Sequence, residues 1–498
     1  MGRHSMFRLT VSLAAITLLA GCNLAPKHVT PQLSTPLAYP PEVSPGGARA
    51  NAVAIDWQTF FQDERLRALI AMALENNRDL RIAVARIDEA KGQFRIRRSD
   101  QLPKLGGSAS YTRLRTGTAS TSPGQAGTTQ GSMQTPNGFE FDSAEVGVAV
   151  SSFELDFWGR VRNLSEAARA QYLGTVAAER AFRLSLIRDL ATAYLTSRSL
   201  AEQAAQADRA IVSRERGLKI AKIRLDAGVT SALDYRQSET LVTQALTQSA
   251  RLRNQRAQQR NIVRLLVGTP IEEETLVSAR PLSEQRLLRD IDAGLPSELL
   301  VNRPDIIEAE ENLRAARANI GAARAAFFPR ISLTGQFGFA STDLANLFGS
   351  AGTNWSFGPS LSLPIFDWGE RKGNLDVARA RQTIEVATYE RTVQRAFREV
   401  SDALADRRYL AEQIVAQDRE VAANRALTQL AQARYDNGVT DFLQVLDAQR
   451  NLFFAEQTLI QLQGQELTSI VTLYAALGGG LGLPPQPRRG NAAPVLQP

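Results

Sequence analysis

The chain offers few side chains that could catalyse a reaction and one that could be covalently modified. Its only histidines are His4 and His28, so catalysis by a histidine acid–base pair and a histidine-ligated metal site are both excluded. Its only cysteine is Cys22, which excludes disulfides and cysteine-ligated metals. Cys22 follows Leu19-Ala20-Gly21, an arrangement typical of a bacterial lipobox, in which the cysteine is acylated and becomes the new first residue. These residues predict lipid attachment rather than catalysis.

The amino terminus supports this prediction. Arg3 and Arg8 flank an apolar run from Leu9 to Ala20, which is too short to span a membrane and is typical of a signal peptide. Asn23 follows the cysteine, and the absence of aspartate there favours export to the outer membrane. The alternative is an ordinary secretory signal in which the cysteine is incidental.

Other catalytic and binding motifs are missing from the sequence. No phosphate-binding loop occurs, and "GGGLG" at Gly478 lacks the strand–turn–helix context of a nucleotide-binding fingerprint. The 58 basic and 51 acidic residues are interleaved along periodic stretches, which indicates a solvated helix surface rather than a nucleic-acid site. We therefore expect neither an enzyme nor a nucleic-acid-binding protein.

Two stretches of the chain repeat each other. "RLDAGVTSALDY" begins at Arg224 and "RYDNGVTDFLQV" begins at Arg434, 210 positions later. Trp158-Gly159 recurs at the same offset as Trp368-Gly369. The sequence therefore predicts a tandem duplication of a unit of about 200 residues, with a Gly/Ser/Thr-rich loop inserted in the first copy.

Each copy contains a long segment with helical character. Between Gly373 and Gly438 there are 64 consecutive residues without glycine or proline, enough for about 95 Å of continuous helix. Within it, Ile384, Val393 and Leu404 belong to a helical apolar stripe. A second helix is predicted after each Gly-Val-Thr turn, over 231–267 and 441–477. Each copy should thus form a long helical hairpin.

Segments in which apolar and polar residues alternate with a period of two residues precede the long helices. Phe337 and Leu361 belong to runs in which apolar residues alternate with serine, threonine, glutamine and glycine, as at Ser360. This alternation is typical of transmembrane barrel strands but also of a soluble sandwich; the small polar second face and Trp355 favour the membrane. In the first copy the alternation slips at Ser151-Ser152, which predicts either a bulge or the exit of the strand from the lipid layer.

Four strands cannot close a barrel, and open strand edges are not tolerated in lipid. The chain is therefore expected to oligomerise around a common axis. Sequence patterns permit eight strands from a dimer or twelve from a trimer.

Several motifs together resemble one family. They are the lipobox at Cys22, "FELDFWGRVR" at Phe153, "VNRPDI" at Val301, "FFPRISLTG" at Phe327 and "YDNGVTDFLQVLDAQR" at Tyr435. The chain resembles the outer membrane factor family of TolC-like ducts, and within it the OprM/NodT lipoprotein branch. The resemblance implies a mixed membrane α+β fold: a homotrimer whose twelve-stranded outer membrane barrel, four strands per chain, continues into a periplasmic α-helical barrel with a mixed equatorial region.

The expected organisation follows from the repeats and the resemblance. A signal peptide (1–21) precedes a lipidated extended tether (22–62), a first repeat (63–268), an equatorial linker (269–298), a second repeat (299–483) and a disordered tail (484–498). The repeats should carry strand hairpins over about 104–157 and 330–366 and helical tips near 228 and 438.

The resemblance also implies a function. It is the outer membrane exit duct of a tripartite efflux pump that passes drugs or other small toxic compounds. Expected partners are two further copies, a periplasmic adapter, an inner membrane transporter of the proton-driven resistance-nodulation-division type and outer membrane lipid. No cofactor is expected beyond the lipid on Cys22. The alternatives are the duct of a type I protein secretion system and a periplasmic coiled-coil protein without a pore.

The resemblance assigns functional residues to the helical tips. Adapter docking is expected at Arg224, Gly228, Leu233, Arg434, Gly438 and Leu443. Leu443 and Asp447, one helical turn apart on one face, are expected to form apolar and anionic rings that close the periplasmic entrance. In the first copy Gln237 stands where the acid would be. The alternatives are turn chemistry alone at the glycines and a surface ion pair between Asp447 and Arg450.

Overall fold

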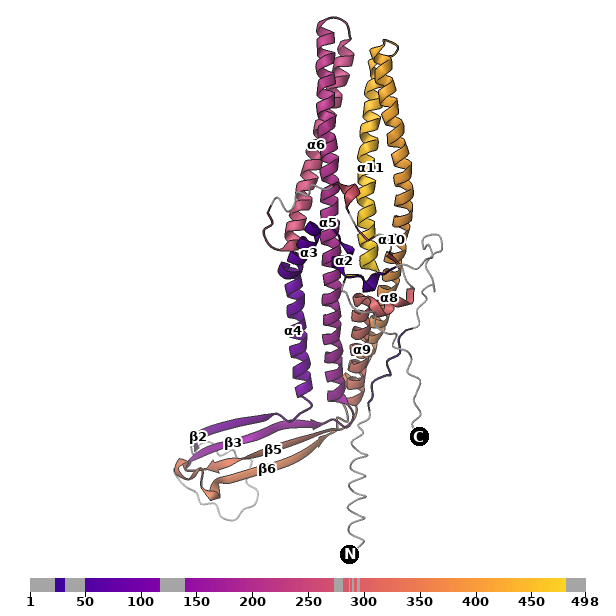
Figure 1. The fold of residues 1–498 in the computed structure, drawn as a ribbon. Coiled ribbons are helices and arrows are strands. Elements are labelled where there is room, and N and C mark those ends of the chain that lie inside the picture. The colour runs from indigo at the N-terminus through magenta and orange to yellow at the C-terminus, as the bar shows by residue number, and fades with distance from the viewer. Residues whose placement is uncertain are drawn as a thin grey trace. The chain divides into compact units, whose positions relative to one another are not determined.

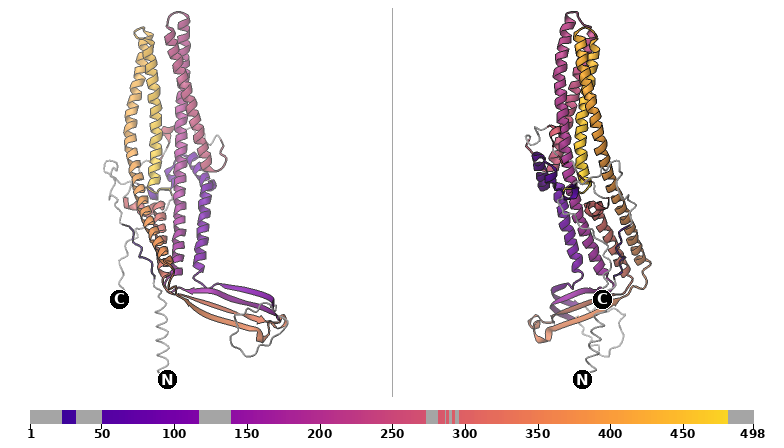
Figure 2. Two further views of the ribbon diagram at one scale, coloured as in Figure 1. Left: turned by 180° about the vertical axis from the view of Figure 1, so that it is seen from behind. Right: turned by 45° about the vertical axis from the view of Figure 1, so that its right-hand side comes forward.

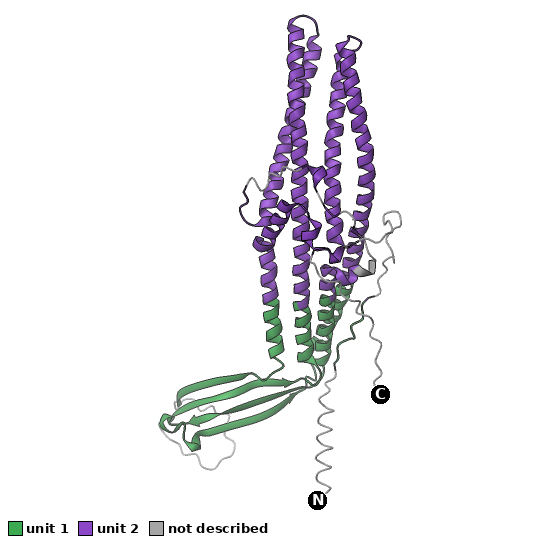
Figure 3. Ribbon diagram, viewed as in Figure 1, with its two compact units in different colours: residues 1–30, 89–172, 311–386 green, residues 31–88, 173–310, 387–498 purple. Residues whose placement is uncertain are grey.

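The computed structural model describes residues 23–31, 50–116, 139–272, 281–285, 287–288, 291–292 and 296–480. The predicted signal peptide, lipidation at Cys22, glycine-rich insertion and tail lie largely or wholly outside these ranges. The described chain divides into two compact units: residues 1–30, 89–172 and 311–386 belong to unit 1, and residues 31–88, 173–310 and 387–498 to unit 2 (Figure 3). Each unit draws on both sequence copies. The predicted domain boundaries correspond to the two sequence repeats and not to these compact units, and they stay predictions.

The long helices of the two copies correspond closely. Helices α5 (Arg160–Asp226) and α10 (Glu370–Asp436) both contain 67 residues. Their returning partners are α6 (Ala232–Val267) and α11 (Phe442–Ala476), within one residue of the predicted bounds. Figure 1 and Figure 2 show α5 beside α6 and α10 beside α11, with the connecting turns at one end. The two predicted helical hairpins are confirmed.

The shorter helices are also duplicated. Helices α4 (Arg78–Ser99) and α9 (Pro304–Ala325) contain 22 residues each. The remaining helical elements are η1 (Ala52–Ala54), α2 (Trp57–Phe60), α3 (Glu64–Asn76), η3 (Leu282–Glu284), α8 (Pro296–Asn302), η4 (Leu344–Asn346) and η5 (Ser350–Gly352).

The core of unit 2 contains residues that the sequence assigns to the extended tether. β1 (Ala50–Asn51) pairs in parallel with β4 (Ile291–Asp292), and Phe60 and Phe61 are fully buried. The ring of Phe60 stacks on that of Tyr474 with centroids 3.8 Å apart, and the Tyr474 hydroxyl donates a hydrogen bond of 2.7 Å to the carbonyl of Ile55. Residues 50–62 are therefore packed elements, because their apolar side chains find a core in which to bury.

The apolar stripe predicted for the second long helix is buried over only part of its length. Val393 and Leu404 are buried, whereas Ile384 is 60% exposed in the single chain. Helical periodicity identifies a packing face but does not tell whether the partner is the same chain or another one.

Unit 1 contains an antiparallel sheet with the strand order β2-β3-β5-β6. The strands are β2 (Leu105–Thr116), β3 (Phe139–Leu155), β5 (Arg330–Ser341) and β6 (Thr353–Ser362). The register between β3 and β5 shifts between Val150 and Phe153, which confirms the predicted bulge. The one extra residue on β3 returns Phe153 to the face that carries Val150, so the apolar residues of β3 stay on one side of the sheet.

The two faces of this sheet differ in chemistry. Phe337 lies opposite Trp355, and Ile331 lies opposite Leu361, so all four share one face. Phe337, Trp355 and Leu361 are 55%, 71% and 66% exposed in the single chain. On the other face the hydroxyls of Ser332 and Ser360 lie 2.8 Å apart. The predicted segregation of apolar and small polar residues is confirmed.

Candidate functional site at the hairpin tips

The first hairpin tip ends α5 with a glycine in the left-handed region. Gly228 has φ +68°, and its amide donates to the carbonyl of Leu225 (3.0 Å) while the amide of Val229 donates to that of Arg224 (2.9 Å). These two bonds form a Schellman motif, in which a residue without a side chain is favoured at the left-handed position. The spacing from Arg224 to Gly228 therefore follows from the way the helix terminates.

The second tip repeats this backbone. Gly438 has φ +71°, its amide donates to the carbonyl of Tyr435 (3.0 Å), and the amide of Val439 donates to that of Arg434 (2.9 Å). Apart from its chain neighbours, a Cβ added at either glycine meets no atom of the described residues within 4 Å. The duplicated motif thus builds two equivalent turns whose outer surfaces are open.

The returning helices begin differently. In the first copy Ser231 caps α6: its hydroxyl accepts from the amide of Asp234 (3.2 Å), and the Asp234 carboxylate accepts from the amide of Ser231 (3.4 Å). The Thr230 hydroxyl donates to the same carboxylate (2.6 Å), and this bond lowers the pKa of Asp234. In the second copy Asp441 precedes α11 without a side-chain cap bond. The first tip therefore has a side-chain cap that the second tip lacks.

Both tips expose apolar side chains. Val229 and Leu233 are 66% and 64% exposed, and Val439 and Leu443 are 64% and 46% exposed. Four such residues at two adjacent turns form the kind of apolar patch that marks an interaction surface.

The two tip arginines have different surroundings. The Arg224 guanidinium donates a hydrogen bond to the Tyr435 hydroxyl and lies 5.0 Å from the centroid of that ring. Arg434 is exposed and forms no ion pair or side-chain hydrogen bond within the described residues. Tyr435 thereby links the second hairpin to the first. The sequence analysis did not identify Tyr435 as a functional residue. A difference between the two copies marks this position, because the first copy has Leu225 where the second has Tyr435.

The predicted gate residues occupy successive turns at the start of α11. Leu443 is partly exposed, and the Asp447 carboxylate accepts a bond of 3.0 Å from the Arg450 guanidinium. Both side chains of this ion pair are about half exposed, so the pair itself stabilises the helix little. In the single chain the alternative interpretation, a surface ion pair, is thus present. The ion pair of Asp447 with Arg450 and the expected role of Asp447 in an anionic ring do not exclude each other.

These features define a class of protein: a tandemly duplicated chain that combines a four-stranded sheet of segregated faces with two long helical hairpins. The sequence matches the outer membrane efflux protein family over residues 69–269 and 295–479, one match for each copy. The chain belongs to this family.

Individual relatives agree with the family match. The chain is 42% identical to the solvent efflux pump outer membrane protein SrpC of Pseudomonas putida, over 95% of this chain and 98% of SrpC. It is 40% identical to the outer membrane protein OprJ of Pseudomonas aeruginosa, over 96% and 97% of the two chains. The open state of the Neisseria gonorrhoeae MtrE outer membrane channel superimposes with a TM-score of 0.82 at 37% identity, covering 92% of this chain and 99% of MtrE.

Family membership confirms the predicted fold class and the absence of enzymatic activity. The chain is an outer membrane component of an efflux pump and acts as a transport duct. Among the helices that the structure describes, none combines the length and the apolar character required to cross a bilayer.

Proposed function

We propose that three copies of this chain form the outer membrane exit duct of a tripartite efflux pump. Drugs and other small toxic compounds pass through it from an inner membrane transporter of the proton-driven resistance-nodulation-division type and a periplasmic adapter. The observation that carries the proposal is the incomplete sheet of unit 1, which has an exposed apolar face and two open edges.

The edges support assembly with further copies. Within the described residues β2 pairs only with β3, and β6 pairs only with β5, so one edge of each terminal strand has no partner. In lipid each unpaired backbone group costs several kcal/mol. Pairing of β6 with β2 of the next copy satisfies these groups, and three copies of four strands give the twelve-stranded barrel that the family resemblance implies.

The substrate class is supported by the relatives. SrpC is named for solvent efflux, which favours small apolar compounds over the protein substrates of a type I secretion duct. To test this, the gene is expressed with a matching transporter and adapter in a strain that lacks its own outer membrane efflux channels. Restored growth in toluene and in antibiotics, without release of a reporter protein carrying a type I secretion signal, supports efflux. Reporter release without restored growth rejects it.

We assign adapter docking to the two tips and closure of the entrance to Leu443 and Asp447. The exposed apolar side chains of both turns support docking, since a helical hairpin of a partner can bury them. The position of Leu443 and Asp447 on one face of α11 supports the gate, because threefold repetition of that face around an axis gives an apolar ring beside an anionic one.

The barrel faces give a matched pair of variants. Phe337→Arg places a charge on the apolar face and should cost about 2–4 kcal/mol near the bilayer midplane, so fewer trimers should assemble. Ser360→Arg places the same side chain on the polar face and should be tolerated. Trimer yield in outer membrane fractions, measured on unheated gels, compares them; equal yields contradict the assignment of the faces.

Lipidation at Cys22 gives a further prediction. The residues that follow Cys22 lie against α9, where the Arg324 guanidinium donates to the carbonyl of Leu24 (3.0 Å). Mass spectrometry of the mature protein should find an acylated amino-terminal Cys22. Cys22→Ser should remove the lipid and weaken anchoring, while the barrel still holds the protein in the membrane. A mature amino terminus at any other residue contradicts the lipobox assignment.

A further inference from the structure

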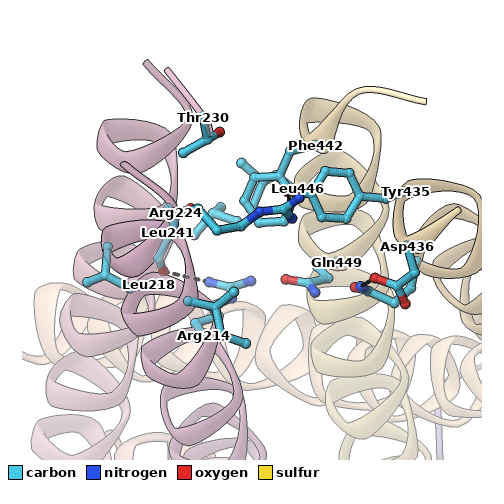
Figure 4. Close-up of a pocket in the computed structure, with 15 residues that line it drawn as sticks. Arg214, Leu218, Arg224, Thr230, Leu241, Tyr435, Asp436, Phe442, Leu446 and Gln449 are labelled. Atoms are coloured by element: carbon cyan, nitrogen blue, oxygen red, sulfur yellow. Dashed lines mark hydrogen bonds between the residues drawn. The ribbon is translucent and has the colours of Figure 1, made fainter. Parts of the chain in front are cut away.

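A cavity of about 150 Å³ lies between the two helical hairpins below their tips. Figure 4 shows its walls: Arg214 and Leu218 come from α5, Leu241 from α6, and Phe442, Leu446 and Gln449 from α11. All of them belong to unit 2. A cavity of about this volume lined by Leu, Ile and Phe side chains accommodates a benzene molecule. By volume, the space is large enough for one aromatic ring.

One wall of the cavity carries a buried positive charge. Arg214 is only 7% exposed, and burial lowers the pKa of its guanidinium. Its Nη1 donates to the carbonyl of Leu241 (2.8 Å), and the guanidinium lies 4.7 Å from the centroid of the Phe453 ring. No carboxylate of the described residues forms an ion pair with it. A buried charge is ordinarily paired with an opposite one, so this guanidinium is suited to an anion.

The charged residues that line the cavity are Arg214, Arg224 and Asp436, so two guanidinium groups face one carboxylate. Asp436 also lines the cavity, but it is exposed and its carboxylate accepts from the Gln432 side-chain amide (2.9 Å). Figure 4 shows Arg214 between the two hairpins with its guanidinium directed toward Gln449, and Asp436 at the far side. An anion that enters from the open side meets Arg214 and the amide of Gln449.

Apolar side chains also line the cavity, beside polar ones such as Thr230 and Ser238. Leu241 and Leu446 are buried, at 7% and 6% exposed, and the ring of Phe442 faces the same space (Figure 4). A ligand with an apolar ring and one carboxylate matches both halves of the site, because an arginine guanidinium binds a carboxylate through two parallel hydrogen bonds.

We propose that this cavity binds a small aromatic carboxylate, with the carboxylate on the guanidinium of Arg214 and the ring between Leu241, Phe442 and Leu446. Because the walls of the cavity come from both hairpins, a bound ligand contacts both of them.

Benzoate is the probe for this site, and benzamide is its neutral analogue of the same shape. Isothermal titration of the purified full-length trimer in detergent should give saturable binding of benzoate, and binding of benzamide weaker by about tenfold or more. Lack of saturable benzoate binding, or equal affinity for the two compounds, overturns the proposal.

Variants locate the binding site. Arg214→Gln should weaken benzoate binding by about tenfold or more, whereas Arg216→Gln, which removes an exposed charge from the same helix, should leave it unchanged. Equal affinities of these two variants overturn the assignment.

A second variant tests the same site independently, in case Arg214→Gln does not fold. Gly217 lines the cavity, and a Cβ there meets nothing within 4 Å. Gly217→Leu adds apolar volume at the cavity and favours the helix, since glycine is a poor helix former. It should assemble normally and lose benzoate binding; retained binding places the ligand elsewhere. These titrations do not depend on conduction or drug resistance, so their failure leaves the proposed function intact.

Discussion

Replacing Gly228 and Gly438 together by aspartate should abolish efflux-dependent drug resistance while trimers still assemble. Both glycines have positive φ, and within the described part of the chain a Cβ at either position meets no atom beyond its chain neighbours. Aspartate is among the few residues that adopt this backbone, at a cost of about 1–2 kcal/mol per position. The added carboxylates therefore leave the turns in place and put charge into the apolar surface on which the adapter docks.

The measurement is the minimal inhibitory concentration of exported antibiotics, read beside the trimer yield of the same cells. Conductance of the purified variant in a planar bilayer is the control, since docking plays no part in it and it should be unchanged. Wild-type resistance in the double variant contradicts docking at the tips and leaves the glycines with a turn-forming role only.

Leu443→Ala combined with Asp447→Ala should raise single-channel conductance and admit large antibiotics without an adapter. The first change removes the apolar ring and the second removes the anionic ring, so the entrance widens and loses its charge. Asp447→Asn alone keeps the size of the side chain and should mainly reduce selectivity for cations, because it removes three negative charges from one level of the trimer.

The first copy supplies a matched control for the gate. Leu233 and Gln237 occupy the equivalent positions there, and Leu233→Ala with Gln237→Ala should change conductance far less. Equal effects of the two double variants contradict a gate built on α11 alone, and unchanged conductance in a correctly assembled Leu443–Asp447 variant places the gate elsewhere.

Much of the fold could be predicted from the sequence because its signals are local and strong. The 64 residues without glycine or proline before Gly438 determine a long helix, and the Gly-Val-Thr turns place its end. The slip at Ser151-Ser152 predicts a bulge or an exit of β3 from the lipid layer, and the register shift between Val150 and Phe153 shows the bulge. Equal spacing of motifs revealed the duplication, which the equal lengths of α5 and α10 confirm.

Other features depend on contacts between distant residues and left weaker signals. The proline-rich segment before residues 50–62 favours an extended tether, but Phe60 and Phe61 pack beside Tyr474, more than 400 positions later. The bond between Arg224 and Tyr435 joins the two copies, and no pattern within one copy predicts it. The burial of Arg214 likewise depends on its contacts with Leu241 of α6 and Phe453 of α11.

Planar bilayer recording of the purified trimer tests most directly the claim that three chains close into a duct. Wild-type trimers should produce uniform, small, cation-selective conductance steps, and trimers of the Leu443→Ala, Asp447→Ala variant should produce larger ones. Trimers that insert into the bilayer but pass no current, in both the wild type and the gate variant, contradict the account.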